Sequence, residues 1–499
     1  MAQRAAAHPA TLTAVFGLIL GVIVALKAPL ALAAGAAALG LAIALRRRFE
    51  LALSLMCWGV VKYSVMGQLG AIAGVIPYAE LALVVMVAAL ALLDEPADSW
   101  LARSRVWRIM PVFALLVFGS WALNGGSLLA LGAGYRSLLT MPLLALTLAR
   151  SMRTREQFDA LYKAGILFTW LQVPVALYQF AFLGGSSSNV DVVAGTLGLG
   201  GSNVLGVWML GATLAALWSY LHKPRAAAAI SGIAFAVTMV FSSARLALYA
   251  APFVLVVALV QYQRQKNAVG HRTLVVALAG VLVFAVAVLG TYSAYSSSGM
   301  RDAGASDINV ASLVAAQSDV SGYGVPRFAY LQYSWDYIRN ASSFWLVGTG
   351  PATGGSGAAS LMNDAGSSQF QTGFRLISLG RGAETGSVHY FVNMPQAMAT
   401  IVESGPLGYL LMLSLYGAVG VMTYRRLRRT EADATGYTAL APAAALVFVA
   451  FVTLGTVYSV VWEGLSITGL CFWWFALMSA SGRFAEGEPA EADILAVDA

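Results

Sequence analysis

Apolar runs of close to 20 residues, nearly free of charge, recur along this sequence and constrain its fold more than any other feature. A helix needs roughly 20 apolar residues to cross the hydrocarbon core of a bilayer. Hydrophobic residues make up 59% of the 499 positions and charged residues only 11%. The alternating short strands of membrane barrels are absent, so the runs are expected to be helices. We therefore predict an all-α, polytopic transmembrane helical bundle.

The boundaries of the apolar runs predict about 14 spans. They lie at 10–26, 28–45, 51–68, 72–93, 109–124, 137–149, 162–183, 202–221, 226–243, 246–262, 273–291, 397–423, 439–457 and 464–480. These spans divide the chain into membrane helices (1–291), a long polar loop (292–396), further membrane helices (397–480) and a tail (481–499). The acidic tail contains few large apolar residues and is expected to be disordered.

Basic residues set the expected orientation, because cytoplasmic loops of membrane proteins carry an excess of Lys and Arg. The basic clusters occur on alternate loops, at Arg46–Arg48, Arg103–Arg108, Arg150–Lys163, Lys223–Arg225, Arg264–Arg272 and Arg425–Arg429. All of them then share the cytoplasmic face with both termini, and the long loop lies on the outer face. The net charge of +7 reflects this topology, so no nucleic-acid partner is expected.

Motifs for metals and cofactors are missing from the sequence. The two cysteines, Cys57 and Cys471, both lie in apolar runs, which argues against a disulfide framework and a zinc site. Neither a nucleotide-binding GxxxxGK[ST] loop nor an HExxH motif occurs. We therefore expect no cofactor and no metal.

The long outer loop is the expected place for chemistry, because a loop of this length in a compact membrane protein is commonly a lid or a catalytic segment. Within it, residues 326–345 predict an amphipathic helix, and glycines from Gly348 onward interrupt regular structure. His389 is the only histidine expected on the outer face, and imidazole is suited to accept a proton near neutral pH. A lone histidine is more often structural, and Glu403, Glu384 and Glu463 are rival bases.

Two arginines on the outer face are candidates for binding an anion. Arg245 lies in a tight turn between two apolar runs, where it either faces an interior anion or extends to the headgroup region. Arg327 is either an exposed residue of the loop helix or a ligand for diphosphate oxygens. Arg136 and Arg381 are further candidates on this face.

Four polar residues are expected inside the membrane. Lys62 and Glu80 lie at similar depths on neighbouring spans and predict a buried ion pair, with a structural role favoured over a proton or ion pathway. Gln172 and Gln179 lie two turns apart on one helix. They either line a cavity or form hydrogen bonds between helices.

Several segments together resemble the superfamily of O-antigen ligases and O-antigen polymerases, which are bacterial envelope enzymes. The likeness rests on Gly195–Gly198 with Asn203, Ser243–Ala247 with Arg245, Arg327 followed by Ser343–Gly350, and His389 followed by Glu403–Gly408. It covers roughly residues 195–425 and the general plan of many helices with one large outer loop late in the chain. These segments do not separate ligase from polymerase.

The resemblance implies a metal-independent, inverting glycan transferase of the bacterial inner membrane, with its active site facing the periplasm. Arg245 and Arg327 would bind the diphosphate of an undecaprenyl-diphosphate-linked donor, and His389 would act as the base on an acceptor hydroxyl. Glu403, Arg381, Arg136 and Asn203 would support the site. The acceptor would be a glycan or a lipid, and other polysaccharide-assembly proteins would be partners. A transporter or flippase of lipid-linked glycans is the alternative.

Overall fold

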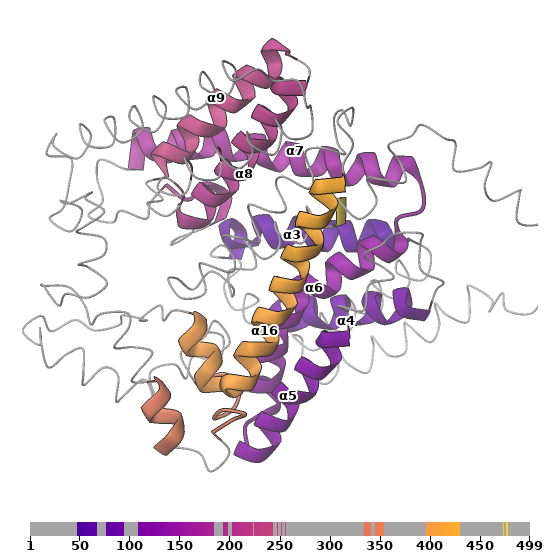
Figure 1. Ribbon diagram of the computed structural model, residues 1–499, viewed down its shortest axis with the longest axis vertical. Coiled ribbons are helices and arrows are strands. Elements are labelled where there is room, and N and C mark those ends of the chain that lie inside the picture. Colours follow the sequence, from indigo (N-terminus) through magenta and orange to yellow (C-terminus); the bar gives the residue numbers. More distant parts are fainter. Residues whose placement is uncertain are drawn as a thin grey trace, which may run out of the picture.

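The computed structural model describes residues 47–66, 76–93, 108–183, 193–197, 202–222, 224–242, 334–340, 345–353 and 396–429, with residues 247, 251, 255, 473, 476 and 477. This part of the chain consists of helices and turns and contains no strand, as the predicted fold class requires (Figure 1). The helices are α3 (Arg48–Met66), α4 (Ile76–Leu93), α5 (Ile109–Asn124), α6 (Leu128–Ser151), α7 (Arg155–Tyr178), α8 (Ser202–His222), α9 (Ala226–Phe241) and α16 (Gln396–Arg429).

Four of the described helical segments are long and apolar enough to cross a membrane. They are Ile76–Leu93, Leu128–Ser151, Arg155–Phe182 and Met398–Arg425. Shorter apolar helices occur at Ile109–Asn124, Val204–Tyr220 and Ala226–Phe241. Of the predicted spans, 10–26, 28–45, 246–262, 273–291, 439–457 and 464–480 lie wholly or almost wholly outside the described residues, so the count of about 14 stays a prediction.

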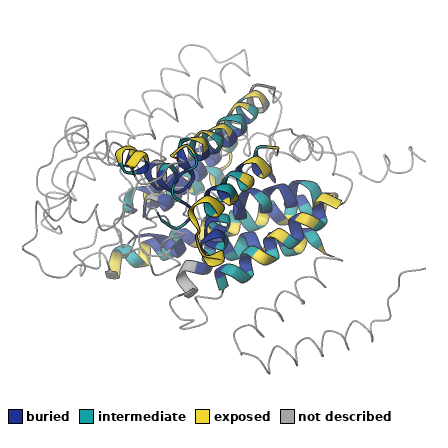
Figure 2. Cartoon of the chain, turned by 90° about the horizontal axis from the view of Figure 1, so that it is seen from below, coloured by how far each residue is buried: buried dark blue, intermediate teal, exposed yellow. Residues whose placement is uncertain are grey.

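Large apolar side chains cover the exposed faces of these helices as well as their buried faces. In α5 the exposed large side chains are Val112, Leu115, Phe118 and Leu123. Buried positions of the same helix, including Phe113 and Val117, pack into the core, and Figure 2 shows the two kinds of position alternating along the helices. An apolar exposed face is costly in water and favourable in lipid, which suits a membrane-embedded helix.

Helix α6 begins at Leu128, nine residues before the predicted start at 137. Its N-cap is Ser127, whose side chain accepts a hydrogen bond from the main-chain nitrogen of Ala130 at 3.1 Å. The predicted start at 137 was wrong, because α6 continues through the charged residue Arg136 toward its N-cap. Arg136 instead lies inside the helix with only 7% of its surface exposed.

Two arginines show which ends of α3, α4 and α6 lie together. Arg48 at the start of α3 and Arg150 near the end of α6 donate to the carbonyl oxygens of Leu90 and Ala91, at 3.2 and 2.9 Å. These carbonyls belong to the last turn of α4, where a positive charge is favoured. The start of α3 and the ends of α4 and α6 therefore share one end of the bundle, which we call the basic end.

Candidate functional site

Helix α16 contains a sharp bend, and the candidate site begins there. Gly405 has non-helical backbone angles of φ 68° and ψ 177°, and Pro406 follows it. Proline has no main-chain N–H, so it cannot donate to the carbonyl of Val402 as a regular helix would require. Figure 1 shows the result, a short arm and a long arm of α16 that meet at an angle.

The turn formed by residues 345–353 pairs with the main-chain groups that this bend leaves free. Thr349 donates its main-chain N–H to the carbonyl of Val402 at 2.7 Å, and Gly350 donates to the carbonyl of Glu403 at 3.1 Å. In return, Leu407 donates to the carbonyl of Leu346 at 3.4 Å. Non-helical backbone is tolerated within a membrane protein where such partners are present. The turn therefore stabilises the bend.

Helices α5 and α6 hold the turn and the bend from the other side. Ser120 donates its hydroxyl to the carbonyl of Glu403 at 2.9 Å, and Asn124 donates its amide to the carbonyl of Gly348 at 3.0 Å. Gly134 of α6 lies against Pro351, since a Cβ added there would lie 2.7 Å from the Cβ of that proline. The site thus joins two consecutive helices, α5 and α6, to a turn and a helix more than 190 residues later in the sequence. We call this end of the bundle the site end.

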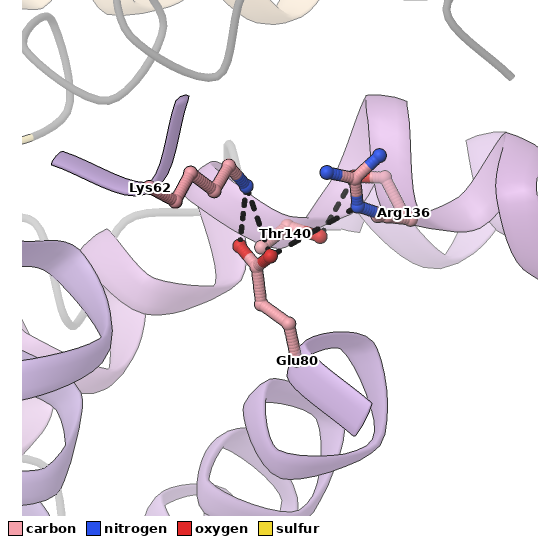
Figure 3. Close-up of polar contacts among 4 residues, drawn as sticks. All are labelled: Lys62, Glu80, Arg136 and Thr140. Atoms are coloured by element: carbon pink, nitrogen blue, oxygen red, sulfur yellow. Dashed lines mark hydrogen bonds and ion pairs between the residues drawn. The ribbon is translucent and has the colours of Figure 1, made fainter. Parts of the chain in front are cut away.

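Lys62 and Glu80 form the buried ion pair that their matched depth predicted. The Lys62 ammonium donates to both carboxylate oxygens of Glu80 at 2.9 Å, and the two side chains are 1% and 2% exposed. Arg136 of α6 joins them, with its Nε atom 4.0 Å from the Oε2 atom of Glu80 (Figure 3). We call these three residues the charge cluster. Its residues come from the halves of α3, α4 and α6 that lie away from the basic end.

Gln172 of α7 and Gln179, which begins the π-helical turn Gln179–Leu183 directly after α7, bind the short helical turn Gly195–Leu197. Gln172 exchanges hydrogen bonds with Thr196, through its amide to the hydroxyl and through its carbonyl to the main-chain N–H, both at 2.8 Å. Gln179 donates its amide to the main-chain carbonyl of Gly195 at 2.9 Å and accepts from the main-chain N–H of Gly195 at 2.7 Å. Of the two predicted roles, the structure shows the one in which the glutamines bind a neighbouring segment. They hold in place the glycine stretch that contributes to the family resemblance.

The structure places some of the predicted site residues and leaves others undescribed. Glu403 is 5% exposed, and its main-chain carbonyl is part of the bend contact. Arg136 is in α6 beside Glu80, and Asn203 is near the start of α8, with its side chain outside the described residues. Arg245, Arg327, Arg381 and His389 also lie outside the described residues, and so does most of the loop 292–396.

Some members of the site were missed from the sequence. Ser120 and Asn124 were not predicted to be site residues, because polar residues near the end of an apolar helix are common. Their four-residue spacing puts them on one helical face, which is the only local signal they carry. Among the described residues, no group of three or more His, Cys, Asp or Glu side chains is placed to hold a metal ion.

Comparison with known proteins adds no relative to this picture. No protein-family model matches the chain, and no curated protein matches it significantly.

Proposed function

We propose that this protein is a membrane-embedded glycan transferase that moves a glycan from an undecaprenyl-diphosphate carrier to an acceptor hydroxyl. The observation that supports this proposal most is the contact between the turn 345–353 and the bend at Gly405. Both belong to segments that carry the resemblance to O-antigen ligases and polymerases. Their hydrogen bonds explain physically why a chain would carry the two segments together.

The contact also bears on the segment between them, residues 354–395, which contains Arg381 and His389. This segment begins directly after the turn and ends at the start of the short arm of α16. The turn and the bend that closes this arm are joined by main-chain hydrogen bonds. His389 precedes Gln396 by seven residues, so chain length alone keeps it within about 25 Å of the start of α16. Chain length therefore limits how far a base at position 389 can lie from the short arm of α16.

The proposed reaction needs two kinds of group. The acceptor oxygen attacks the anomeric carbon as the bond between that carbon and the diphosphate oxygen breaks, which inverts the configuration. His389 takes the hydroxyl proton, and Arg245 and Arg327 stabilise the negative charge that develops on the leaving diphosphate. The diphosphate is already a good leaving group, so the reaction requires no metal ion in this proposal.

The proposal includes a location and a set of partners. The chain would lie in the inner membrane of a bacterium, with its site end on the periplasmic side opposite the basic end. Its partners would be the lipid-linked donor, a glycan or lipid acceptor, and the surrounding bilayer. A donor with a long lipid tail would reach a site between helices from within the membrane.

A transfer assay tests the proposal. Purified full-length protein in detergent receives a labelled lipid-linked glycan and a candidate acceptor, and the product is measured by gel or mass spectrometry. We expect wild-type protein to form product and His389→Ala to lose it. The control His271→Ala changes a histidine on a loop predicted to lie at the other face, and it should keep wild-type activity. Full activity of His389→Ala would remove this residue from the mechanism.

The same substrate distinguishes an enzyme from a transporter. In liposomes, a flippase would move the labelled lipid across the bilayer without changing its glycan. Movement without product would overturn the proposed function. The length distribution of the product separates the two enzyme types, since a polymerase makes a ladder of products and a ligase adds one preassembled glycan to its acceptor.

A further inference from the structure

The charge cluster contains two cations and one carboxylate. Lys62 occupies both oxygens of Glu80 at hydrogen-bond distance. Arg136 approaches one of these oxygens only to 4.0 Å, and its Nε atom has no hydrogen-bond partner among the described residues. Since a guanidinium group does not lose its proton in proteins, Arg136 is a positive charge without a full counter-charge in the described part of the chain.

Burial makes that excess charge costly. The side chain of Arg136 is 9% exposed, and those of Lys62 and Glu80 are still less exposed. An incompletely paired charge in a medium of low dielectric constant is strongly unfavourable, and arginines within membrane proteins commonly face an interior site or an anion. A bound anion would offset this cost.

The orientation of the guanidinium group indicates what kind of anion fits. Its Nε atom lies 4.0 Å from the Oε2 atom of Glu80, and Figure 3 shows one terminal nitrogen on the side of Lys62 and the other on the far side of the group from that carboxylate. The terminal nitrogens present planar N–H donors, which match a pair of oxygens on one phosphorus or carbon atom. Glu80 holds the group in this orientation from one side, so the donors on the other side remain available to a ligand.

The position of the cluster indicates where the anion would come from. Lys62 lies four residues before the end of α3, and Glu80 lies four residues after the start of α4. Arg136 lies eight residues after the start of α6, or about 12 Å along the helix axis. All three therefore lie in the halves of their helices toward the site end, within about three turns of the helix ends there.

We propose that Arg136 binds a phosphoryl oxyanion carried by a membrane lipid, with Glu80 positioning the guanidinium group and Lys62 adding positive charge. This site is distinct from the assigned roles of Arg245, Arg327 and His389, and it does not depend on the proposed transfer reaction. A free phosphate or diphosphate offers the same chemistry, and the experiment below separates the two sources.

Thermal unfolding of the full-length protein in an uncharged detergent tests this site. Phosphatidic acid, phosphatidylcholine, sodium pyrophosphate and sodium chloride are titrated, with the salts at matched ionic strength. We expect phosphatidic acid to raise the Tm of wild-type protein by several degrees in a saturable way, and chloride and phosphatidylcholine to raise it less. A response to pyrophosphate as well identifies the phosphoryl group itself as the ligand, whereas a response to phosphatidic acid alone assigns the site to lipids.

Variants of Arg136 distinguish ligand binding from a purely structural role. In Arg136→Gln the apparent affinity for phosphatidic acid should fall at least about tenfold, the scale for losing hydrogen bonds to a charged group. Its Tm without ligand should not fall below that of wild-type protein, because the excess charge is gone. Arg136→Lys keeps the charge without the fork and should bind with intermediate affinity.

Arg155→Gln is the matched control. It removes an arginine that is 46% exposed at the basic end, where it pairs with Asp159, and it should keep the wild-type response to phosphatidic acid. The proposal is overturned if wild-type protein responds to phosphatidic acid no more than to chloride, or if Arg136→Gln keeps the full response. Native mass spectrometry of the wild-type protein gives a readout without variants: selective retention of phosphatidic acid over phosphatidylcholine supports the site, and equal retention contradicts it.

Discussion

Gly348 and Gly405 are packed so closely that neither position has room for a side chain. A Cβ on Gly348 would lie 2.5 Å from the main-chain nitrogen of Gly405, and a Cβ on Gly405 would lie 2.7 Å from that of Gly348. Both residues also have positive φ angles, 79° and 68°, which glycine adopts readily and other residues rarely do. The turn and the bend in α16 therefore fit each other only because each contributes a glycine at the point of contact.

This packing predicts that Gly348→Ala and Gly405→Ala destabilise the protein severely. Each substitution adds backbone strain of about 1–3 kcal/mol and a clash with main-chain atoms that cannot rotate away. We expect a clear fall in Tm for both variants in detergent. Gly417→Ala is the control, since a Cβ there meets nothing within 4 Å, and it should be neutral or slightly stabilising. Equal Tm values for Gly405→Ala and Gly417→Ala would contradict the close contact.

The charge cluster predicts that losing Glu80 destabilises the protein more than losing Lys62. Glu80→Gln leaves two buried cations without their carboxylate, a loss on the scale of about 3–5 kcal/mol. Lys62→Met removes one cation and leaves Glu80 with Arg136, so the remaining charges balance. We therefore expect a considerably larger fall in Tm for Glu80→Gln than for Lys62→Met. The reverse order would show that the charges are balanced in some other way.

The glutamine contacts predict that α7 holds the Gly195–Leu197 turn through main-chain hydrogen bonds. Gln172→Leu removes the acceptor of the Thr196 N–H, and an unpaired buried N–H costs about 1–3 kcal/mol. We expect lower stability and faster proteolytic cleavage near this turn. Ser231→Ala removes a hydroxyl that bonds only within its own helix, to the carbonyl of Ala227, and should leave both measurements unchanged. An unaltered cleavage rate in Gln172→Leu would show that Gln172 does not hold this turn in place.

The proposed transfer reaction predicts that Arg245→Ala and Arg327→Ala each lower the initial rate at least about tenfold, as expected for losing a group that stabilises developing charge. Both variants should remain folded, as judged by Tm. Arg264→Ala removes an arginine from a predicted cytoplasmic loop and should keep the wild-type rate. An unchanged rate in either of the first two variants would exclude that residue from the site.

The proposed chemistry also predicts that activity survives removal of divalent cations. The arginines supply the positive charge that a metal ion would otherwise supply to the leaving diphosphate. Transfer is therefore expected at the same rate with and without a chelator such as EDTA. Loss of activity with the chelator and its recovery on adding Mg²⁺ or Mn²⁺ would refute a metal-independent mechanism.

The helical class and the ends of several described helices could be predicted from the sequence, because a bilayer imposes a length and a composition on each span. The start of α8 at Ser202 and the end of α5 at Asn124 agree with the predicted boundaries. The pairing of Lys62 with Glu80 was also predictable, since opposite charges at the same depth on neighbouring spans have few other partners. The error at α6 arose because a buried arginine is tolerated only with a partner that hydropathy does not reveal.

Side-chain type and local periodicity were enough to predict that these segments are apolar helices and where their charged residues concentrate. The approach of Arg136 to Glu80, the packing of Gly348 against Gly405, and the hydrogen bonds of Ser120 and Asn124 could be seen only in the folded chain. Each of these depends on which helices are neighbours and on how a bend exposes main-chain carbonyls. Such contacts are formed between residues tens to hundreds of positions apart, where no local pattern records them.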